Sequence, residues 1–299
     1  MCENVPQWLV EKVRSIGSTV GAANREQVYL DAAGWTIAQY LGFDVSKAAP
    51  DSIFENSANP HGTLSARTIN RVILVGESLF LLRNCTGFAE FCRRLKTRDF
   101  RAALFELVSA KQFFRAGFDL HARPETLVKG DDFDFAATRG TELINVEVTA
   151  FTANDYSSNT VVNSLGQKRG QLPPTAPAII CCVIPEQWLK AAIDWDTALT
   201  EITSEFFKRT GRINAVVFWG ELDLKSSVGS GGAWGLVRKS YFHPSPRFSV
   251  VDMTYLVGGK LRSETVREAM ATGEGEDALW GSAYSSGFFR WVDSLVPAN

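Results

Sequence analysis

The chain of 299 residues is 45% hydrophobic, which is enough to bury a full core in one large domain or two smaller ones and excludes a disordered chain. Its 31 Lys and Arg residues against 33 Asp and Glu residues give a formal net charge of −2, and its pI is near 6.0. This balance excludes a protein that coats nucleic acid nonspecifically, because such affinity comes from basic side chains that neutralise phosphates, but it is compatible with a local basic groove.

Residues 1–95 are expected to form a mostly helical N-terminal region. Apolar residues recur at helical spacing in several runs, among them Ile69 to Leu82. The stretch from Lys47 to Ser65 contains two prolines and several Asn and Ser residues, which predicts a loop. The region is either a lobe that contacts substrate, a partner protein or a second copy of the chain, or a helical extension that simply packs on the rest.

The sequence predicts a cytoplasmic protein without a membrane segment. The first six residues include Glu3 and contain no apolar segment of a secretory signal. The longest apolar run, Val72 to Leu82, is interrupted by Gly76 and Glu77 and is too short to span a bilayer. The five cysteines form no C-x-x-C pair and are expected to be reduced, and with three histidines a Cys/His metal site or a Ser-His-Asp triad is not expected.

A helix is predicted over Phe100 to Ala116, because apolar residues follow helical spacing and Gly117 is a typical C-cap. Glu106 lies among apolar residues of this helix. A carboxylate in that position is costly unless it meets a cation, a metal ion or water. A salt bridge to Lys111 or to an arginine is one explanation, and a role as metal ligand is the other. A short strand over Phe118 to Leu120 follows.

Two β-rich runs then predict a hairpin with its turn near residues 139–141. The first run, residues 131–136, alternates carboxylates with aromatic residues. At a strand period of two, Asp132 and Asp134 share one face, and Phe133 and Phe135 share the other.

The second run, residues 143–149, places Asn145, Glu147 and Thr149 on one face and branched apolar residues on the other. Hairpin pairing then puts Asp134 roughly opposite Glu147. Two neighbouring carboxylates are suitable oxygen ligands for Mg²⁺ or Mn²⁺. A hairpin whose polar side faces solvent would explain the same pattern without any site.

The remaining elements extend an α/β sheet. A helix that ends at Pro173 precedes a buried strand over Ala178 to Ile184. A helix over Trp195 to Lys208 follows, and then strands at 215–219 and 234–242, separated by a flexible glycine-rich turn at 229–232. An aromatic-rich helix is predicted within residues 278–295, and its aromatic side chains are interpreted as core rather than as a base-stacking platform: Trp280, Phe288, Phe289 and Trp291.

The order of these elements resembles that of a known superfamily. An α-β-β-β-α-β order over about residues 100–184, the helical Glu106, the hairpin from Asp134 to Glu147 and the Glu147-Val148-Thr149 tripeptide are similar to the PD-(D/E)XK, or restriction-endonuclease-like, superfamily. The resemblance implies an α/β fold with this core and a mixed sheet in residues 96–299, preceded by the helical region of residues 1–95.

The resemblance also implies a metal site. In that superfamily an Asp at the start of the hairpin and the acidic residue of an E-x-K tripeptide bind Mg²⁺ or Mn²⁺, and a helical Glu often adds a ligand. Asp134, Glu147 and Glu106 match these positions in this sequence, and Asp132 competes with Asp134 for the first of them.

The superfamily's lysine, which helps to orient the attacking water, is replaced here by Thr149. Lysine sometimes migrates to a neighbouring helix in such proteins, so Lys168 is the expected replacement and Lys111 the second candidate. Arg169 and Gln171, next to Lys168, are the residues expected to contact the substrate phosphate.

Three functions remain open from the sequence. The first is a divalent-metal-dependent nuclease that hydrolyses phosphodiester bonds in DNA or RNA. The second is a noncatalytic binding or assembly module with the same fold, in which the lysine has been lost. The third is an unrelated α/β protein in which the pattern is coincidental. Metal binding discriminates between the first two, and a Glu106 that faces away from Asp134 and Glu147 would remove most of the support for the enzyme.

Basic residues cluster in four places, and each cluster is either a solvated face or part of a phosphate track. The clusters are Arg93-Arg94-Lys96-Arg98-Arg101, Lys168-Arg169, Lys208-Arg209-Arg212 and Arg238-Lys239.

Overall fold

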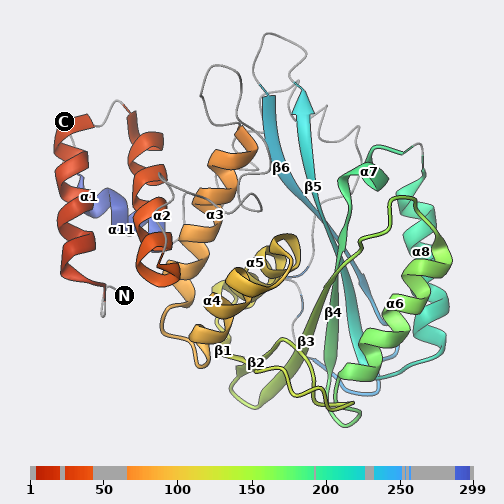
Figure 1. Cartoon of the computed structure of the whole chain (residues 1–299). Coiled ribbons are helices and arrows are strands. Elements are labelled where there is room, and N and C mark those ends of the chain that lie inside the picture. The colour runs from red at the N-terminus through yellow and green to blue at the C-terminus, as the bar shows by residue number, and fades with distance from the viewer. Residues whose placement is uncertain are drawn as a thin grey trace. The chain divides into compact units, whose positions relative to one another are not determined.

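The computed structural model of the chain describes residues 5–20, 24–42, 66–191, 193–225, 232–250, 253, 256 and 287–296. The chain divides into two compact units, which Figure 1 shows as ribbons. The helical unit comprises Met1–Arg83, Lys225–Trp234 and Val266–Asn299, and the sheet unit comprises Asn84–Leu224 and Gly235–Thr265. The division therefore falls at Arg83 rather than near residue 95, and the C-terminal segment belongs with the N-terminal helices.

The described residues of the helical unit form α1 (Gln7–Val20), α2 (Arg25–Leu41), α3 (Ala66–Leu82) and α11 (Gly287–Leu295). The C-terminal helix packs on α2, where the rings of Tyr29 and Phe289 meet edge to face at 4.8 Å and the Tyr29 hydroxyl donates to Asp293. Phe288, Phe289 and Trp291 are buried, so their interpretation as core residues is confirmed. Trp280 and the predicted loop at residues 47–65 lie outside the described residues.

The sheet unit contains a six-stranded mixed sheet in the order β1-β2-β3-β4-β5-β6. The first three strands pair antiparallel, and β3, β4 and β5 pair parallel to one another. The strands are β1 (Asp119–Ala122), β2 (Phe135–Arg139), β3 (Glu142–Ala150), β4 (Ala178–Ile184), β5 (Ile213–Lys225) and β6 (Gly232–Phe242). The α/β class and the expected order α, β, β, β, α, β are both present.

Helices cover both faces of this sheet (Figure 1). One face carries α5, which contacts β1, β3 and β4 and is itself contacted by α4, and the other carries α6 and α8. The helices are α4 (Phe88–Thr97), α5 (Phe100–Arg115), α6 (Ser158–Gln171), α7 (Glu186–Leu189) and α8 (Trp195–Lys208). Because it is covered on both sides, β4 is a continuous apolar run in which every residue is buried.

Local sequence explains the two ends of α5 and the turn of the hairpin formed by β2 and β3. Helix α5 begins after Asp99, whose side chain accepts a hydrogen bond from the backbone N–H of Ala102, and the chain leaves it through Gly117 at φ 83°. The hairpin turns at Gly140, where φ is 59°, so that Arg139 pairs with Glu142.

The hairpin departs from the sequence prediction in one respect. Strand β2 begins at Phe135, whereas an alternating strand was expected from residue 131. Phe133 and Phe135 were expected to share a face, and this prediction is wrong. Phe133 packs in the core that contains α6 and α8, while the ring of Phe135 meets Phe91 of α4 and Phe113 of α5. The chain is not yet in the sheet at Phe133, so the period of two does not apply there.

Two further elements are longer than predicted. Helix α6 begins at Ser158, and β5 continues to Lys225. The expected flexible turn at residues 229–232 lies almost entirely outside the described residues. None of the described helices is long and apolar enough to cross a membrane.

Candidate functional site

Asp134 and Glu147 lie side by side where β2 begins. Phe135 pairs with Val146, and the backbone N–H of Asp134 donates to the Val146 carbonyl at 3.2 Å, which places Asp134 opposite Glu147 as predicted. Oδ2 of Asp134 accepts a hydrogen bond of 2.7 Å from the backbone N–H of Val148. Asp134 is 4% exposed and Glu147 is 3% exposed, so the polar side of the hairpin does not face solvent at this point.

Glu106 reaches the same place from α5 through two arginines. Its Oε2 lies 2.9 Å from Nη1 of Arg94, and its Oε1 lies 2.5 Å from Nη1 of Arg98. The same two nitrogen atoms lie 3.4 Å and 3.1 Å from Oδ1 of Asp134. The expected salt bridge from Glu106 to an arginine is therefore present, and the arginines connect Glu106 to Asp134 rather than separating it from the hairpin.

Lys168 completes the group from the other side of the sheet. Its Nζ lies 2.7 Å from Oε1 of Glu147 and is held there by α6. Thr149, in the position of the superfamily's lysine, lies on β3 opposite Cys182 of β4. A lysine thus approaches the hairpin carboxylate from the helix, where the sequence placed it. Lys111, the second candidate, lies buried on α5.

Burial sets the pKa values of the two glutamates. It raises the pKa of Glu106 to about 8, with the charge of Asp134 adding to the effect and Arg94 and Arg98 opposing it. Burial also raises the pKa of Glu147 well above its ordinary value, again with Asp134 adding and Lys168 opposing. Burial alone would lower the pKa of Lys168, but the attraction of Glu147 outweighs it, so the lysine pKa is raised and its charge is retained.

We call these six residues the carboxylate cluster: Glu106, Asp134, Glu147, Arg94, Arg98 and Lys168. Three acidic and three basic side chains balance in formal charge. Removing ions from water is costly, and each buried charge here is compensated by an opposite one. The cluster concentrates the residue types that phosphoryl chemistry uses.

The donor atoms suit a hard divalent cation only in part. Carboxylate oxygens on adjacent strands, from Asp134 and Glu147, are the ligand type that Mg²⁺ prefers, and Mg²⁺ is commonly held by one or two carboxylates with water and phosphate oxygens completing the shell. Among the residues that the structure describes, however, no three Asp, Glu, His or Cys side chains are placed to share one ion. Arg94 and Arg98 contact the side of Asp134 that faces Glu106.

Asp132, the competing ligand candidate, has a different set of contacts. Its Oδ1 accepts from the backbone N–H of Thr126 at 3.0 Å, and its Oδ2 lies 3.5 Å from Nε2 of Gln171. The backbone N–H of Asp132 donates to the Gln171 carbonyl. These bonds fix the loop before β2, and the structure brings Asp134, not Asp132, to Glu106 and Glu147.

Arg169 and Gln171, the predicted substrate contacts, line a groove beside Lys168. The groove has a volume of about 660 Å³ and is bordered by the C-terminal half of α6 and the loop before β2. Nη1 of Arg169 donates to the carbonyl of Arg209 at 3.0 Å, which holds this side chain along the groove. We call this cavity the basic groove; its lining is Leu127, Val128, Lys129, Asp132, Gly166, Gln167, Lys168, Arg169, Gly170, Gln171 and Arg212.

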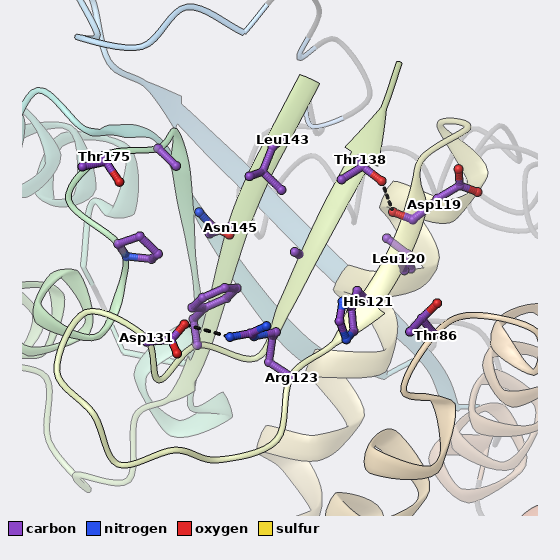
Figure 2. A pocket seen from close by; sticks show the side chains of 14 residues that line it. Thr86, Asp119, Leu120, His121, Arg123, Asp131, Thr138, Leu143, Asn145 and Thr175 are labelled. Atoms are coloured by element: carbon purple, nitrogen blue, oxygen red, sulfur yellow. Dashed lines mark hydrogen bonds and ion pairs between the residues drawn. The ribbon is translucent and has the colours of Figure 1, made fainter. Parts of the chain in front are cut away.

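A second cavity, of about 550 Å³, lies over the first three strands. Figure 2 shows the side chains of His121, Thr138 and Asn145, from β1, β2 and β3, over one face of these strands, with the ion pair of Arg123 and Asp131 at its side. Asn145 and Glu147 are two residues apart on β3 and therefore point to the same face. This cavity offers hydrogen-bonding groups on the Glu147 side of the hairpin.

Sequence reasoning missed the two arginines of the cluster. Arg94 and Arg98 belong to a basic run that was interpreted as a solvated face or a phosphate track, yet Arg94 is only 1% exposed. Their signal was indirect. A carboxylate embedded in an apolar helix requires a partner, and the two arginines that meet Glu106 precede it by 12 and 8 residues.

No protein-family model matches the chain, and no curated protein matches it. Functional inference therefore rests on the geometry of the carboxylate cluster and the basic groove beside it.

Proposed function

We propose that the chain is a divalent-metal-dependent nuclease with a restriction-endonuclease-like core. The observation that carries the proposal is the meeting of Asp134, Glu147 and the α6 lysine at one point. Nζ of Lys168 lies 2.7 Å from Glu147, and Asp134, the residue directly before β2, lies beside Glu147 of β3. An arbitrary α/β protein has no reason to bury two carboxylates and a lysine together beside the start of β2.

The order and pairing of the elements support the same assignment. Helix α5, the antiparallel strands β1, β2 and β3, helix α6 and the parallel strand β4 follow one another as the resemblance implies. The three acidic residues come from α5, from the residue before β2 and from β3, and backbone pairing or a backbone hydrogen bond fixes the last two. Sites built on paired strands hold their side chains more precisely than sites on loops.

Asp134 and Glu147 are the residues that would hold Mg²⁺ or Mn²⁺. When bound, the ion would supply Lewis-acid chemistry at the phosphoryl group. The hydrogen bond from Val148 fixes the carboxylate of Asp134, and the pairing of β2 with β3 fixes its distance from Glu147.

The basic side chains have separate roles in this proposal. Lys168 stays protonated because of Glu147 and would donate a hydrogen bond to a phosphoryl oxygen or to the attacking water. The side chain of Arg98 is 28% exposed and would pair with a phosphate oxygen, whereas the buried Arg94 and Glu106 would hold it in position. Glu106 is then a positioning residue that acts through the arginines.

One observation favours a second candidate, a noncatalytic binding or assembly module. The three carboxylates already have three cations, so the cluster needs no metal ion to be neutral. In that case the cluster would fix the relative positions of α4, α5, β2, β3 and α6, and removal of one of its cations would leave a buried carboxylate uncompensated and reduce stability.

Cleavage of a mixed panel of labelled DNA and RNA, with Mn²⁺ or Mg²⁺ and with EDTA, tests the proposal. Wild-type chain is compared with Glu147→Gln, which keeps the size of the side chain, and with Glu142→Gln as the matched control. Glu142 lies on the same strand but pairs with Arg139 at the hairpin turn. We expect metal-dependent cleavage by the wild type and Glu142→Gln, and a loss of at least about 100-fold in Glu147→Gln.

Two other outcomes contradict the proposal. Equal cleavage by wild type and Glu147→Gln would place the activity elsewhere or in a contaminant. Cleavage by none of the three proteins, with all three folded by circular dichroism, would support the noncatalytic module.

A further inference from the structure

The loop that borders the basic groove presents an unusual apolar tip. Leu127 is 86% exposed and Val128 is 57% exposed, although both are apolar and adjacent. Leu127 also has a φ of 56°, a left-handed conformation that is unfavourable for a branched side chain. Neither the exposure of Leu127 nor its strained backbone contributes to the stability of the isolated chain.

The strained tip is held firmly from both sides. The hydroxyl of Thr126 donates to the Asp131 carbonyl at 2.8 Å, and the backbone N–H of Thr126 donates to the Asp132 carboxylate. The N–H of Gly130 donates to the carbonyl of Gly170 at 3.0 Å and ties the loop to α6. These hydrogen bonds hold the backbone of the loop in its strained conformation, so the side chain of Leu127 stays exposed at a fixed position.

The groove beside the tip has an excess of positive charge. Four basic side chains, Lys129, Lys168, Arg169 and Arg212, line it together with a single acidic residue. The guanidinium of Arg212 donates to the backbone carbonyl of Arg169, and burial, reinforced by the charge of Arg169, lowers the pKa of Arg212. Two neighbouring arginines that repel each other would be stabilised by an anion between them.

The floor of the groove leaves the helix backbone open. Gly166 and Gly170 are one turn apart on α6, and the space that a Cβ atom would enter is empty at both. A chain that lies against this face can therefore approach the helix closely. Lys168, between the two glycines, also contacts Glu147, so the groove leads to the carboxylate cluster.

We propose that the basic groove binds a nucleic-acid strand, with its phosphates against Lys129, Arg169 and Arg212 and an unstacked base against Leu127. The proposal rests on the proposed function and specifies how the substrate reaches the cluster. Basic side chains supply the affinity for a phosphate backbone, and apolar side chains inserted at a base step gain contact only where a base is exposed. Single strands and locally opened duplexes both offer this combination.

Fluorescence anisotropy with labelled oligonucleotides in EDTA tests the groove without cleavage. The probes are DNA and RNA of mixed sequence, each as a single strand and as a duplex. Leu127→Asn is the first variant, because asparagine tolerates a positive φ and the change relieves strain instead of endangering the fold. Leu143→Asn is its control, since Leu143 is an exposed leucine (42%) outside the basic groove.

Lys129→Gln is the second variant, and Lys208→Gln, an exposed lysine of α8 outside the groove, is its control. We expect Leu127→Asn to weaken binding about threefold to tenfold, which corresponds to part of the burial of one leucine. We expect Lys129→Gln to reduce the slope of log affinity against log salt by about 0.7 to 1, as for the loss of one phosphate contact. Both controls should bind like the wild type.

If Leu127→Asn weakens the binding of single strands, the base comes from a single strand. If it weakens the binding of duplexes, the base comes from a locally opened duplex. The proposal would be overturned if both groove variants bound as tightly as the wild type, or if the controls were weakened as much as the groove variants. Absence of binding by the wild type would also overturn it. Groove-dependent binding without metal-dependent cleavage would refute only the nuclease. Metal-dependent cleavage with unchanged binding in both groove variants would refute only the groove.

Discussion

Replacing Glu106 by glutamine is expected to flatten the pH dependence of stability between about pH 5 and pH 8. In the unfolded chain this carboxyl titrates near its ordinary pKa of 4.5, whereas burial, helped by Asp134, raises its pKa in the folded protein to about 8. Between these values the folded protein binds more protons than the unfolded chain, so the free energy of unfolding must fall as the pH rises. Stability from this group is complete below about pH 4.5 and is lost as the pH passes 8.

The size of the effect follows from the same two values. At about 1.4 kcal/mol for each tenfold change in proton affinity, the displacement from 4.5 to about 8 corresponds to a loss on the order of 5 kcal/mol over this range. Glutamine resembles the protonated acid and does not titrate. We therefore expect Glu106→Gln to be about as stable as the wild type near pH 5 and more stable near pH 9.

Urea unfolding at several pH values, followed by fluorescence and circular dichroism, measures this difference. Glu125→Gln is the matched control, because Glu125 shares Arg98 with Glu106 but its side chain is 41% exposed. The hydrogen bond from Arg98 lowers the pKa of Glu125, so its contribution is lost only as the pH falls below its ordinary range. Parallel curves for wild type and Glu106→Gln between pH 5 and pH 9 would refute the electrostatic account of the cluster.

Further predictions concern the arginines of the cluster and the turn before α4. Arg98→Gln should lower stability by about 2 kcal/mol without metal, because it leaves two buried carboxylates short of a cation, and should show a larger rise in melting temperature with Mn²⁺ than the wild type. Arg139→Gln is the control, because it loses an ion pair, a hydrogen bond to the Ala116 carbonyl and a ring contact with Phe118, all outside the cluster, and equal Mn²⁺ shifts in both variants would contradict the prediction. Gly87→Ala should lower the free energy of unfolding by about 3 kcal/mol, since φ is 76° and an added Cβ would lie 2.4 Å from a backbone carbonyl oxygen. Gly117→Ala, with a φ of 83° and open space around it, should lose only about 1 kcal/mol in the same denaturation experiment, and equal losses would mean that the close contact is not decisive.

Local pattern in the sequence determined most of the sheet unit. The seven-residue run of β4 is apolar at every position, so both faces of the strand are apolar. This predicts a strand that is covered on both sides, whereas an alternating run would predict one polar face. The turn at Gly140 and the period of two then place Asp134 opposite Glu147 by counting outward along both strands. Helical spacing likewise placed Glu106 and Lys168 on the two helices that flank the hairpin. These inferences hold because each depends on neighbours along the chain.

Only the tertiary structure decided which charges meet. Arg94 and Arg98 contact Asp134 from 40 and 36 residues away, a distance over which no periodicity carries information. The tertiary structure also decided where β2 begins, and with it the separation of Phe133 from Phe135 onto opposite faces of the sheet. A repeating pattern fixes the direction of a side chain relative to its own element, whereas burial and charge compensation are settled by the elements that pack around it. The sequence by itself therefore determined the candidate carboxylates and the displaced lysine, and the packing of α4 against α5 and β1 supplied the cations that balance them.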